Sequence, residues 1–206
     1  MKVLLINCSP HPYGCTYTAL KEVADTLESC GVETEILQVG TTPLQPCTAC
    51  RACKQTNRCI YDDAANIILD KMTHMDGMVI GSPVHYASPS GTAVTLMDRV
   101  FYAGGSTLHH KPGAAIVSAR RAGTTAALDV LNKYILYAQM PLVTSRYWNM
   151  VHGNTSEEVK QDTEGMQIMR VLGRNMAWLL KCIEAGKQAG IPYPEAESPI
   201  HTNFIR

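Results

Sequence analysis

Residues 3–18 read Val3-Leu-Leu-Ile-Asn-Cys-Ser-Pro-His-Pro-Tyr-Gly-Cys-Thr-Tyr-Thr18 and combine a strand, a loop and the start of a helix. The first four residues are all apolar, a pattern typical of a strand that is covered on both faces inside a parallel sheet. The residues after the loop are spaced as the apolar face of a helix, and Gly31 ends it. A strand, a loop and a helix in this order form the repeating unit of a doubly wound α/β sheet. The apolar positions of the helix are Leu20, Val23, Ala24 and Leu27.

The same alternation continues along the chain. Further short runs of apolar or small residues predict strands at 34–39, 77–82, 114–118 and 142–145. Amphipathic spacing predicts helices around 67–72, 94–101 and 128–135, and a longer one through 159–183 before Gly186. Because βαβ crossovers are right-handed, this alternation places helices on both faces of a doubly wound sheet. Five strands is the number in the flavodoxin-like variant of that sheet. We therefore predict an α/β fold: a flavodoxin-like, doubly wound, five-stranded parallel sheet in the order 2-1-3-4-5.

Nothing in the sequence divides it into separate units. It has no internal repeat, charge run or Gly/Ser linker, so we expect a single domain over residues 1–206. The tail, residues 190–206, contains Pro192, Pro194 and Pro199 and cannot be helical throughout. We expect it to be either an arm on a neighbouring subunit or a frayed end.

The overall composition excludes several classes of partner. The 206 residues include 18 basic and 18 acidic side chains, so the formal net charge is zero. This balance does not suit a nucleic-acid surface or a polybasic patch for anionic lipid. The first apolar run is too short for a signal peptide, and no run approaches membrane-spanning length. We therefore expect a cytoplasmic protein with no nucleic-acid and no membrane partner.

Four of the eight cysteines fall in one loop, residues 47–59, with the spacing C-x2-C-x2-C-x5-C. Four thiolates in one loop suit a metal ion or a metal cluster. Zinc sites usually take their ligands as two separated pairs, whereas this compact run is closer to the ferredoxin type that holds an iron–sulfur cluster. The last gap is longer than in ferredoxins and there is no second set of cysteines, so the last cysteine would complete the same cluster. Zinc, or no metal at all, remains an alternative. The four cysteines are Cys47, Cys50, Cys53 and Cys59.

The other four cysteines are not expected to bind metal. Cys8 ends a predicted buried strand, Cys30 and Cys182 fall on predicted helices, and Cys15 lies in the first loop. Cysteine in such places serves as a small buried apolar residue or a loop filler. Disulfides are disfavoured in the reducing compartment that we expect.

The loops that follow the first, third and fourth strands are predicted to meet at one edge of the sheet. In a parallel sheet the carboxyl ends of the strands share an edge, and ligands bind there at the switch point. The first loop offers hydroxyls on Ser9, Thr16 and Thr18 and the backbone N–H groups of a helix start, which suit a phosphate. It lacks the Gly-Lys-Ser/Thr ending of a Walker loop and the three glycines of a dinucleotide fingerprint. A capped helix with no ligand is the alternative.

The other two loops suit a flat ring. Residues 81–91 present His85 and Tyr86 between two prolines, and residues 118–125 contain Arg120 and Arg121 among small side chains. Together the three loops suit a heteroaromatic cofactor with one phosphate, although His85 and Tyr86 could also be ordinary surface rings.

Three motifs resemble those of one family. Ser82-Pro83-Val84-His85-Tyr86, followed by Leu96-Met97-Asp98-Arg99, resembles a segment of NADPH-dependent FMN reductase-like flavoproteins, and the first loop resembles their phosphate motif. The cysteine loop, followed by Asp62 and Asp63, resembles that of the iron–sulfur flavoprotein branch of the family, whose compact cysteine run holds a [4Fe–4S] cluster. The resemblance covers roughly residues 2–125.

The resemblance implies a set of residues for each cofactor. FMN would bind without a covalent bond, and the flavin rather than a side chain would carry the chemistry. The phosphate and ribityl end would be held by Ser9, His11, Gly14, Cys15, Thr16 and Thr18. The flavin ring would be lined by Pro83, Val84, His85 and Tyr86, and its pyrimidine end by Ala119, Arg120 and Gly123. The cluster would be bound by Cys47, Cys50, Cys53 and Cys59.

Three positions depart from the family pattern. His11 stands where arginine is usual, so the charge that meets the phosphate depends on pH. Cys15 replaces an asparagine and loses a side-chain donor, and Val94 stands where lysine is common. None of these changes removes the backbone contacts.

The resemblance implies an FMN-dependent oxidoreductase of the iron–sulfur flavoprotein type, which passes electrons between a flavin and a [4Fe–4S] cluster. NAD(P)H is a possible electron donor, the redox partner is a small molecule or a protein, and a homodimer or homotetramer is expected. The first alternative is a cluster-free NAD(P)H-dependent reductase of FMN, quinones, nitro or azo compounds. The second is a zinc-stabilised, non-catalytic binding protein.

Overall fold

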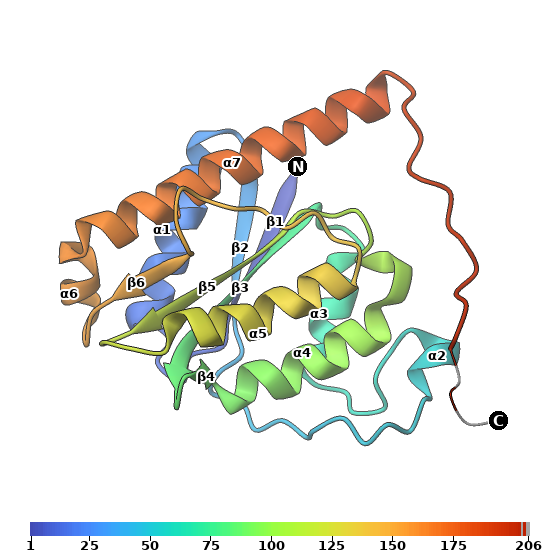
Figure 1. The fold of residues 1–206 in the computed structure, drawn as a ribbon, viewed down its shortest axis with the longest axis horizontal. Helices are drawn as coiled ribbons and strands as arrows, with labels where there is room; N and C mark the ends of the chain where they lie inside the picture. The colour runs from blue at the N-terminus through green and yellow to red at the C-terminus, as the bar shows by residue number, and fades with distance from the viewer. Residues whose placement is uncertain (203, 205–206) are drawn as a thin grey trace.

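A parallel sheet forms the centre of the molecule in this computed structural model, which describes residues 1–202 and 204. Its strand order is β2-β1-β3-β5-β6, and the short β4 pairs antiparallel with the end of β3 (Figure 1). With β4 set aside, this is the predicted order 2-1-3-4-5, so the predicted doubly wound fold is confirmed. The strands are β1 (Lys2–Asn7), β2 (Glu33–Gln38), β3 (Gly77–His85), β4 (Ser88–Pro89), β5 (Gly113–Ala119) and β6 (Met150–His152).

Helices cover both faces of the sheet, and each face has its own hydrophobic core. Along β1, Leu4 and Ile6 pack on the α3, α4 and α5 side, whereas Val3 and Leu5 pack on the α1 and α7 side. All four side chains are fully buried, as their continuous apolar run predicts. The helices are α1 (Cys15–Ser29), α2 (Cys53–Thr56), α3 (Ala64–Met72), α4 (Gly91–Gly104), the 3-10 turn η1 (Gly105–Thr107), α5 (Thr124–Tyr137), α6 (Ser156–Gln161) and α7 (Thr163–Gln188).

The prediction of the fifth strand at residues 142–145 is wrong. That run makes one parallel bridge, between Leu142 and Gly113, and β6 forms further along the chain. Val143 is buried, which explains the apolar run, but the chain then leaves the sheet edge and returns where Met150 pairs with Val117. Buried Asn149 holds this return, because its amide donates to the Ala115 carbonyl at 3.1 Å. A short apolar run reports burial and does not by itself report strand pairing.

The helix boundaries agree with the sequence at some ends and differ at others. Gly31 has a positive φ of 81° just past α1, where the sequence predicts the end of this helix. The Asp63 side chain caps α3 by accepting from the Ala65 N–H. The last pattern splits into two helices, because Asp162 ends α6 and caps α7. Gly186 does not end α7, which continues to Gln188.

The tail folds back toward its own chain at its first aromatic residue. Tyr193 stacks on His110 with 5.2 Å between ring centroids, and the Lys187 ammonium lies 5.7 Å from the Tyr193 centroid. From residue 191 onward the described tail contains no helix or strand. In the part of the chain that the structure describes, no helix has the length and apolar character needed to cross a membrane.

Candidate functional site

The three loops predicted to meet do lie together at the carboxyl edge of the sheet. The Thr16 hydroxyl, at the start of α1, is 2.8 Å from the hydroxyl of Ser118 at the end of β5. A methyl group added at Gly123 would come within 2.8 Å of the Ala87 backbone, so the loops after β3 and β5 pack closely. The parallel register of β1, β3 and β5 produces this arrangement.

The loop after β1 is held from behind by side chains of neighbouring strands. The side-chain oxygen Oδ1 of Asn7 accepts the Ser9 N–H at 3.1 Å, and the Gln38 side-chain amide donates to the Ser9 backbone carbonyl at 2.8 Å. The Asn7 and Gln38 side chains also bond to each other at 2.5 Å. The Ser9 hydroxyl accepts the His11 N–H at 3.1 Å. This network fixes the path of the loop before α1 begins.

The start of α1 presents backbone donors. The first N–H groups of a helix have no partner inside it, and the N-cap Gly14 has no side chain with which to cap them. Together with the helix dipole, these groups favour an anion. The hydroxyl of Thr18 donates to the Gly14 carbonyl at 3.1 Å, so it stabilises the helix start. Ser9, Thr16 and Thr18 are buried, Gly14 and Cys15 are half-buried, and His11 is exposed.

Cys15 occupies the first turn of α1 as a neutral thiol. Its sulfur lies 3.6 Å from the Gly153 carbonyl oxygen. Burial raises the pKa of the Cys15 thiol, and Glu158 and Glu157 raise it further. A neutral thiol adds no negative charge next to the place predicted for the phosphate.

The loop after β3 is a tight hairpin. Tyr86 and Ala87 connect β3 to β4, and both have positive φ, 50° and 58°. A two-residue connection with two positive φ values is the type I′ turn of β-hairpins, and it carries strain when neither residue is glycine. The Ser90 N–H donates to the Ser82 hydroxyl at 2.9 Å and holds the hairpin base.

The residues predicted to contact the flavin ring lie on the solvent side of the carboxyl edge of the sheet. His85, Tyr86 and Arg120 are exposed, whereas Pro83, Val84, Ala119 and Gly123 are half-buried. Tyr86, at the hairpin tip, is fully open to solvent.

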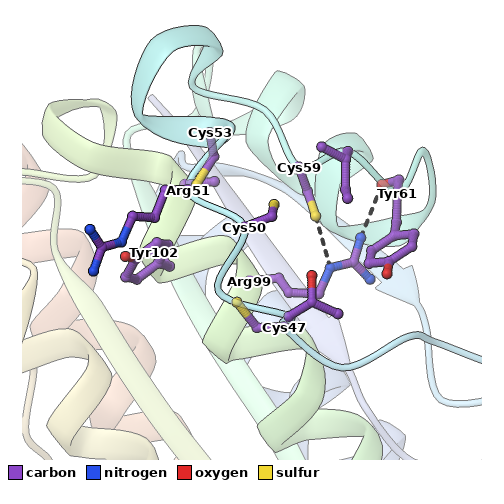
Figure 2. A pocket seen from close by; sticks show the side chains of 11 residues that line it. Cys47, Cys50, Arg51, Cys53, Cys59, Tyr61, Arg99 and Tyr102 are labelled. Atoms are coloured by element: carbon purple, nitrogen blue, oxygen red, sulfur yellow. Dashed lines mark hydrogen bonds between the residues drawn. The ribbon is translucent and has the colours of Figure 1, made fainter.

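All four cysteines of residues 47–59 line one cavity (Figure 2). The cavity also contacts Tyr61, Arg99 and Tyr102, and its empty volume, open mouth included, is about 340 Å³. Cys53 is buried at the start of α2, Cys59 is half-buried, and Cys47 and Cys50 are exposed. Within residues 1–202 and 204, no three histidine, cysteine or acidic side chains are close enough together to bind one metal ion.

The remaining cysteines lie away from this cavity. Burial raises the pKa of the Cys8 thiol to about 12, so at neutral pH this buried thiol is almost entirely protonated. Cys30 and Cys182 lie at the end of α1 and on α7. None of the eight cysteines forms a disulfide in the described structure.

Comparison with known proteins assigns the chain to a family. Residues 1–155 match the family described as NADPH-dependent FMN reductase. The chain belongs to this family. It is therefore a flavoprotein oxidoreductase, and membership supports FMN as its cofactor. This membership excludes the second alternative from the sequence, a zinc-stabilised, non-catalytic binding protein.

Proteins named iron–sulfur flavoproteins are among the relatives of this chain. One from Methanocaldococcus jannaschii is 31% identical over 192 residues, which cover 89% of this chain and all of that protein. One from Methanosarcina thermophila is 23% identical, with 91% of this chain and 99% of that protein covered.

Solved structures share its flavodoxin-like fold. RosB, solved with an 8-demethyl-8-formylriboflavin-5'-phosphate intermediate, superposes with a TM-score of 0.68 at 14% identity, covering 100% of this chain and 92% of RosB. An NAD(P)H:quinone oxidoreductase from Methanothermobacter marburgensis gives 0.66 at 15% identity, covering 85% and 96%. At these identities the likeness concerns the fold.

The structure adds residues that the sequence analysis did not single out. Gly40, just after β2, lies directly against the first loop, because a methyl group added there would be 2.0 Å from the Ser9 carbonyl oxygen. Gln38 supports the same loop from β2. A glycine after a predicted strand signals a close backbone approach, but only the structure identifies what approaches it.

Arg99 is the second residue whose role emerges from the structure, because the sequence analysis named it only as part of a motif. It lies on the buried face of α4 between Met97 and Val100, and its side chain is fully buried beneath the cysteine loop. A charged residue on an apolar helix face is a signal that could have marked it, because a buried charge needs a partner.

Proposed function

We propose that this flavoprotein oxidoreductase binds FMN at the carboxyl edge of the sheet and a [4Fe–4S] cluster between its four loop cysteines, and that it passes electrons between the two. The observation that carries the proposal is that Cys47, Cys50, Cys53 and Cys59 line one cavity. The names of the related iron–sulfur flavoproteins support the same assignment.

The flavin site is supported by the chemistry of the edge. The uncapped start of α1 suits a phosphate, and the loops after β3 and β5 form the wall beside it. The flavin supplies the redox chemistry when bound, while the protein binds and orients it. The residues proposed to hold it are Ser9, His11, Gly14, Cys15, Thr16, Thr18, Pro83, Val84, His85, Tyr86, Ala119, Arg120 and Gly123.

The donor set of the cysteine cavity fits an iron–sulfur cluster better than zinc. A zinc ion needs its ligands gathered at about 2.3 Å from one point. The cysteine sulfurs face one cavity without being gathered that closely. A four-iron cluster is larger than one ion and holds its four thiolates farther apart, so this looser arrangement suits it.

We propose that residues 1–206 form one domain, with the cysteine loop and the tail 190–206 as its appendages. The proposed electron donor is NAD(P)H, and the proposed acceptor is a small molecule or a redox protein. We also propose a homodimer or homotetramer, because flavin sites in such families often lie at a subunit boundary.

The test is to purify the protein without oxygen and to measure flavin, iron and sulfide per chain, with EPR spectra after reduction. We expect one FMN, about four irons and a reduced-cluster EPR signal. Protein with FMN but without iron would instead favour the cluster-free reductase of FMN, quinones, nitro or azo compounds.

Ser9→Ala is expected to weaken FMN binding about 10- to 150-fold. A hydrogen bond to a charged group contributes about 1.5–3 kcal/mol, and the Ser9 hydroxyl lies at the proposed phosphate site. Fluorescence titration of the apoprotein with FMN measures the change. Ser29→Ala is the matched control, because its hydroxyl donates to the Thr26 carbonyl at the opposite end of α1, so FMN affinity should stay at the wild-type value. Equal affinity in Ser9→Ala and wild type would contradict the phosphate assignment.

A further inference from the structure

Every N–H group of the Arg99 guanidinium has an acceptor. A guanidinium has five such donors. Two go to the carboxylate of Asp63, at 2.7 and 2.8 Å, and two go to the backbone carbonyls of Gln45 at 3.2 Å and Tyr61 at 3.0 Å. The fifth, on Nε, points at the sulfur of Cys59 at 3.1 Å (Figure 2). All five N–H donors of this buried cation therefore have an acceptor, and one of these acceptors is the sulfur of a cysteine.

These contacts join the two ends of the cysteine loop. Gln45 precedes the first cysteine of the loop, whereas Tyr61 and Asp63 follow the last. The Tyr61 ring also covers the guanidinium, with 5.3 Å from Cζ to the ring centroid. Since Arg99 is on α4, its side chain fixes both ends of the loop to the helix layer of the sheet.

A second side chain holds the backbone of Cys59. The side-chain oxygen Oδ1 of Asn66 accepts the Cys59 N–H at 2.8 Å, and its side-chain nitrogen Nδ2 donates to the Cys59 backbone carbonyl at 3.0 Å. Asn66 is 2% exposed, so it comes from inside the protein. Cys59 is thus fixed at its backbone and at its sulfur, while Cys47 and Cys50 lie on the outside.

We propose that Arg99 is a positioning residue of the cluster site, which holds Cys59 in place and raises the reduction potential of the cluster through the Nε–H to Cys59 sulfur hydrogen bond. The inference rests on the proposed function. Hydrogen bonds to the sulfurs of a cluster, and the charge around it, set its potential. A buried cation that donates to a ligand sulfur stabilises the reduced cluster, because reduction adds one negative charge.

The test uses protein loaded with its cluster and measures the midpoint potential by redox titration followed by EPR. In Arg99→Lys the positive charge stays, but an ammonium cannot serve Asp63, both carbonyls and the sulfur together. We expect a lower cluster potential and a changed EPR line shape. Arg58→Lys is the control, because it makes the same charge-conserving change at a residue that precedes Cys59 but pairs with Asp62 and Asp70 at the surface. Its potential should stay close to the wild-type value.

A double variant guards against a folding defect. Arg99→Gln combined with Asp63→Asn removes the buried ion pair as a whole and leaves no unpaired charge. It should also lower the potential, or lose the cluster while far-UV circular dichroism and FMN content stay unchanged, and both results support the role. A wild-type potential and spectrum in iron-loaded Arg99→Lys would overturn it.

A measurement on the iron-free protein tests the positioning role separately. Amide hydrogen exchange over residues 45–63 should speed up in Arg99→Lys and stay unchanged in Arg58→Lys, since Arg99 joins the two ends of the loop whereas a lysine at position 58 can still pair with Asp62 and Asp70. Unchanged exchange in Arg99→Lys would overturn the clamp. Wild-type protein that never takes up iron would overturn the proposed function and the potential effect together, which distinguishes that failure from failure of the Arg99 role alone.

Discussion

Cys50→Ser is expected to purify with FMN but without iron, whereas wild-type protein prepared in the same way is expected to carry about four irons per chain. Cys50 lines the cavity with the other three loop cysteines, and a cluster that loses one of its four thiolates is no longer enclosed by the protein. FMN should stay bound, because the flavin edge is built from other loops. Iron and sulfide analysis after anaerobic purification measures the change.

Cys182→Ser is the control for this substitution. Cys182 is exposed on α7, away from the cavity, so its replacement makes the same chemical change without removing a proposed ligand. Its iron content should equal that of wild type. If Cys50→Ser kept its full iron content, or if Cys182→Ser lost it, the assignment of the ligands would be wrong.

Gly40→Ala is expected to disturb the flavin edge strongly, although it adds only one methyl group. The added carbon would lie 2.0 Å from the Ser9 carbonyl oxygen and 2.2 Å from the Ser9 carbonyl carbon. These are backbone atoms, so the loop itself must move. We expect a loss of stability of about 1–3 kcal/mol or more from overpacking. FMN affinity should fall at least about tenfold, because the shifted loop precedes the donors of α1.

Thermal unfolding of the apoprotein and FMN titration measure these two effects. Gly186→Ala is the control, since its added methyl group would meet the Ile191 side chain at an ordinary contact distance of 3.9 Å, near the end of α7. That variant should keep its FMN affinity and be slightly more stable, because alanine favours a helix more than glycine does. A Gly40→Ala protein with wild-type affinity would show that the first loop does not depend on its close contact with Gly40.

Much of the fold follows from local patterns in the sequence. Strands buried on both faces have continuous apolar runs, and the alternation with amphipathic helices leaves few topologies, so β1, β2, β3 and β5 and the sheet order were predictable. The fifth strand was not. Val143 is as apolar as a strand residue, but Asn149 decides where the chain returns to the sheet. A buried asparagine has no periodicity that a sequence reader can detect.

The candidate site also has one part that the sequence predicts and one part that it does not. Cysteine spacing predicted that four thiols would converge, because near neighbours in one loop can reach one cavity without help from the fold. The roles of Arg99, Asn66 and Gly40 depend on contacts between residues distant in the chain. Arg99 reaches Gln45 and Cys59, which are 54 and 40 positions away. Only the packed helices and strands bring such residues together.

The attachment of the cysteine loop implies an order in which the polypeptide would fold and acquire the proposed cluster. The side chains that hold Cys59 come from α3 and α4, and both helices need the sheet to pack against. Cys47 and Cys50 remain on the outside once that packing is complete. We therefore expect the polypeptide to fold during biosynthesis before iron is delivered through the open side of the loop. Cells short of iron would then accumulate a folded, yellow, iron-free protein rather than an aggregate.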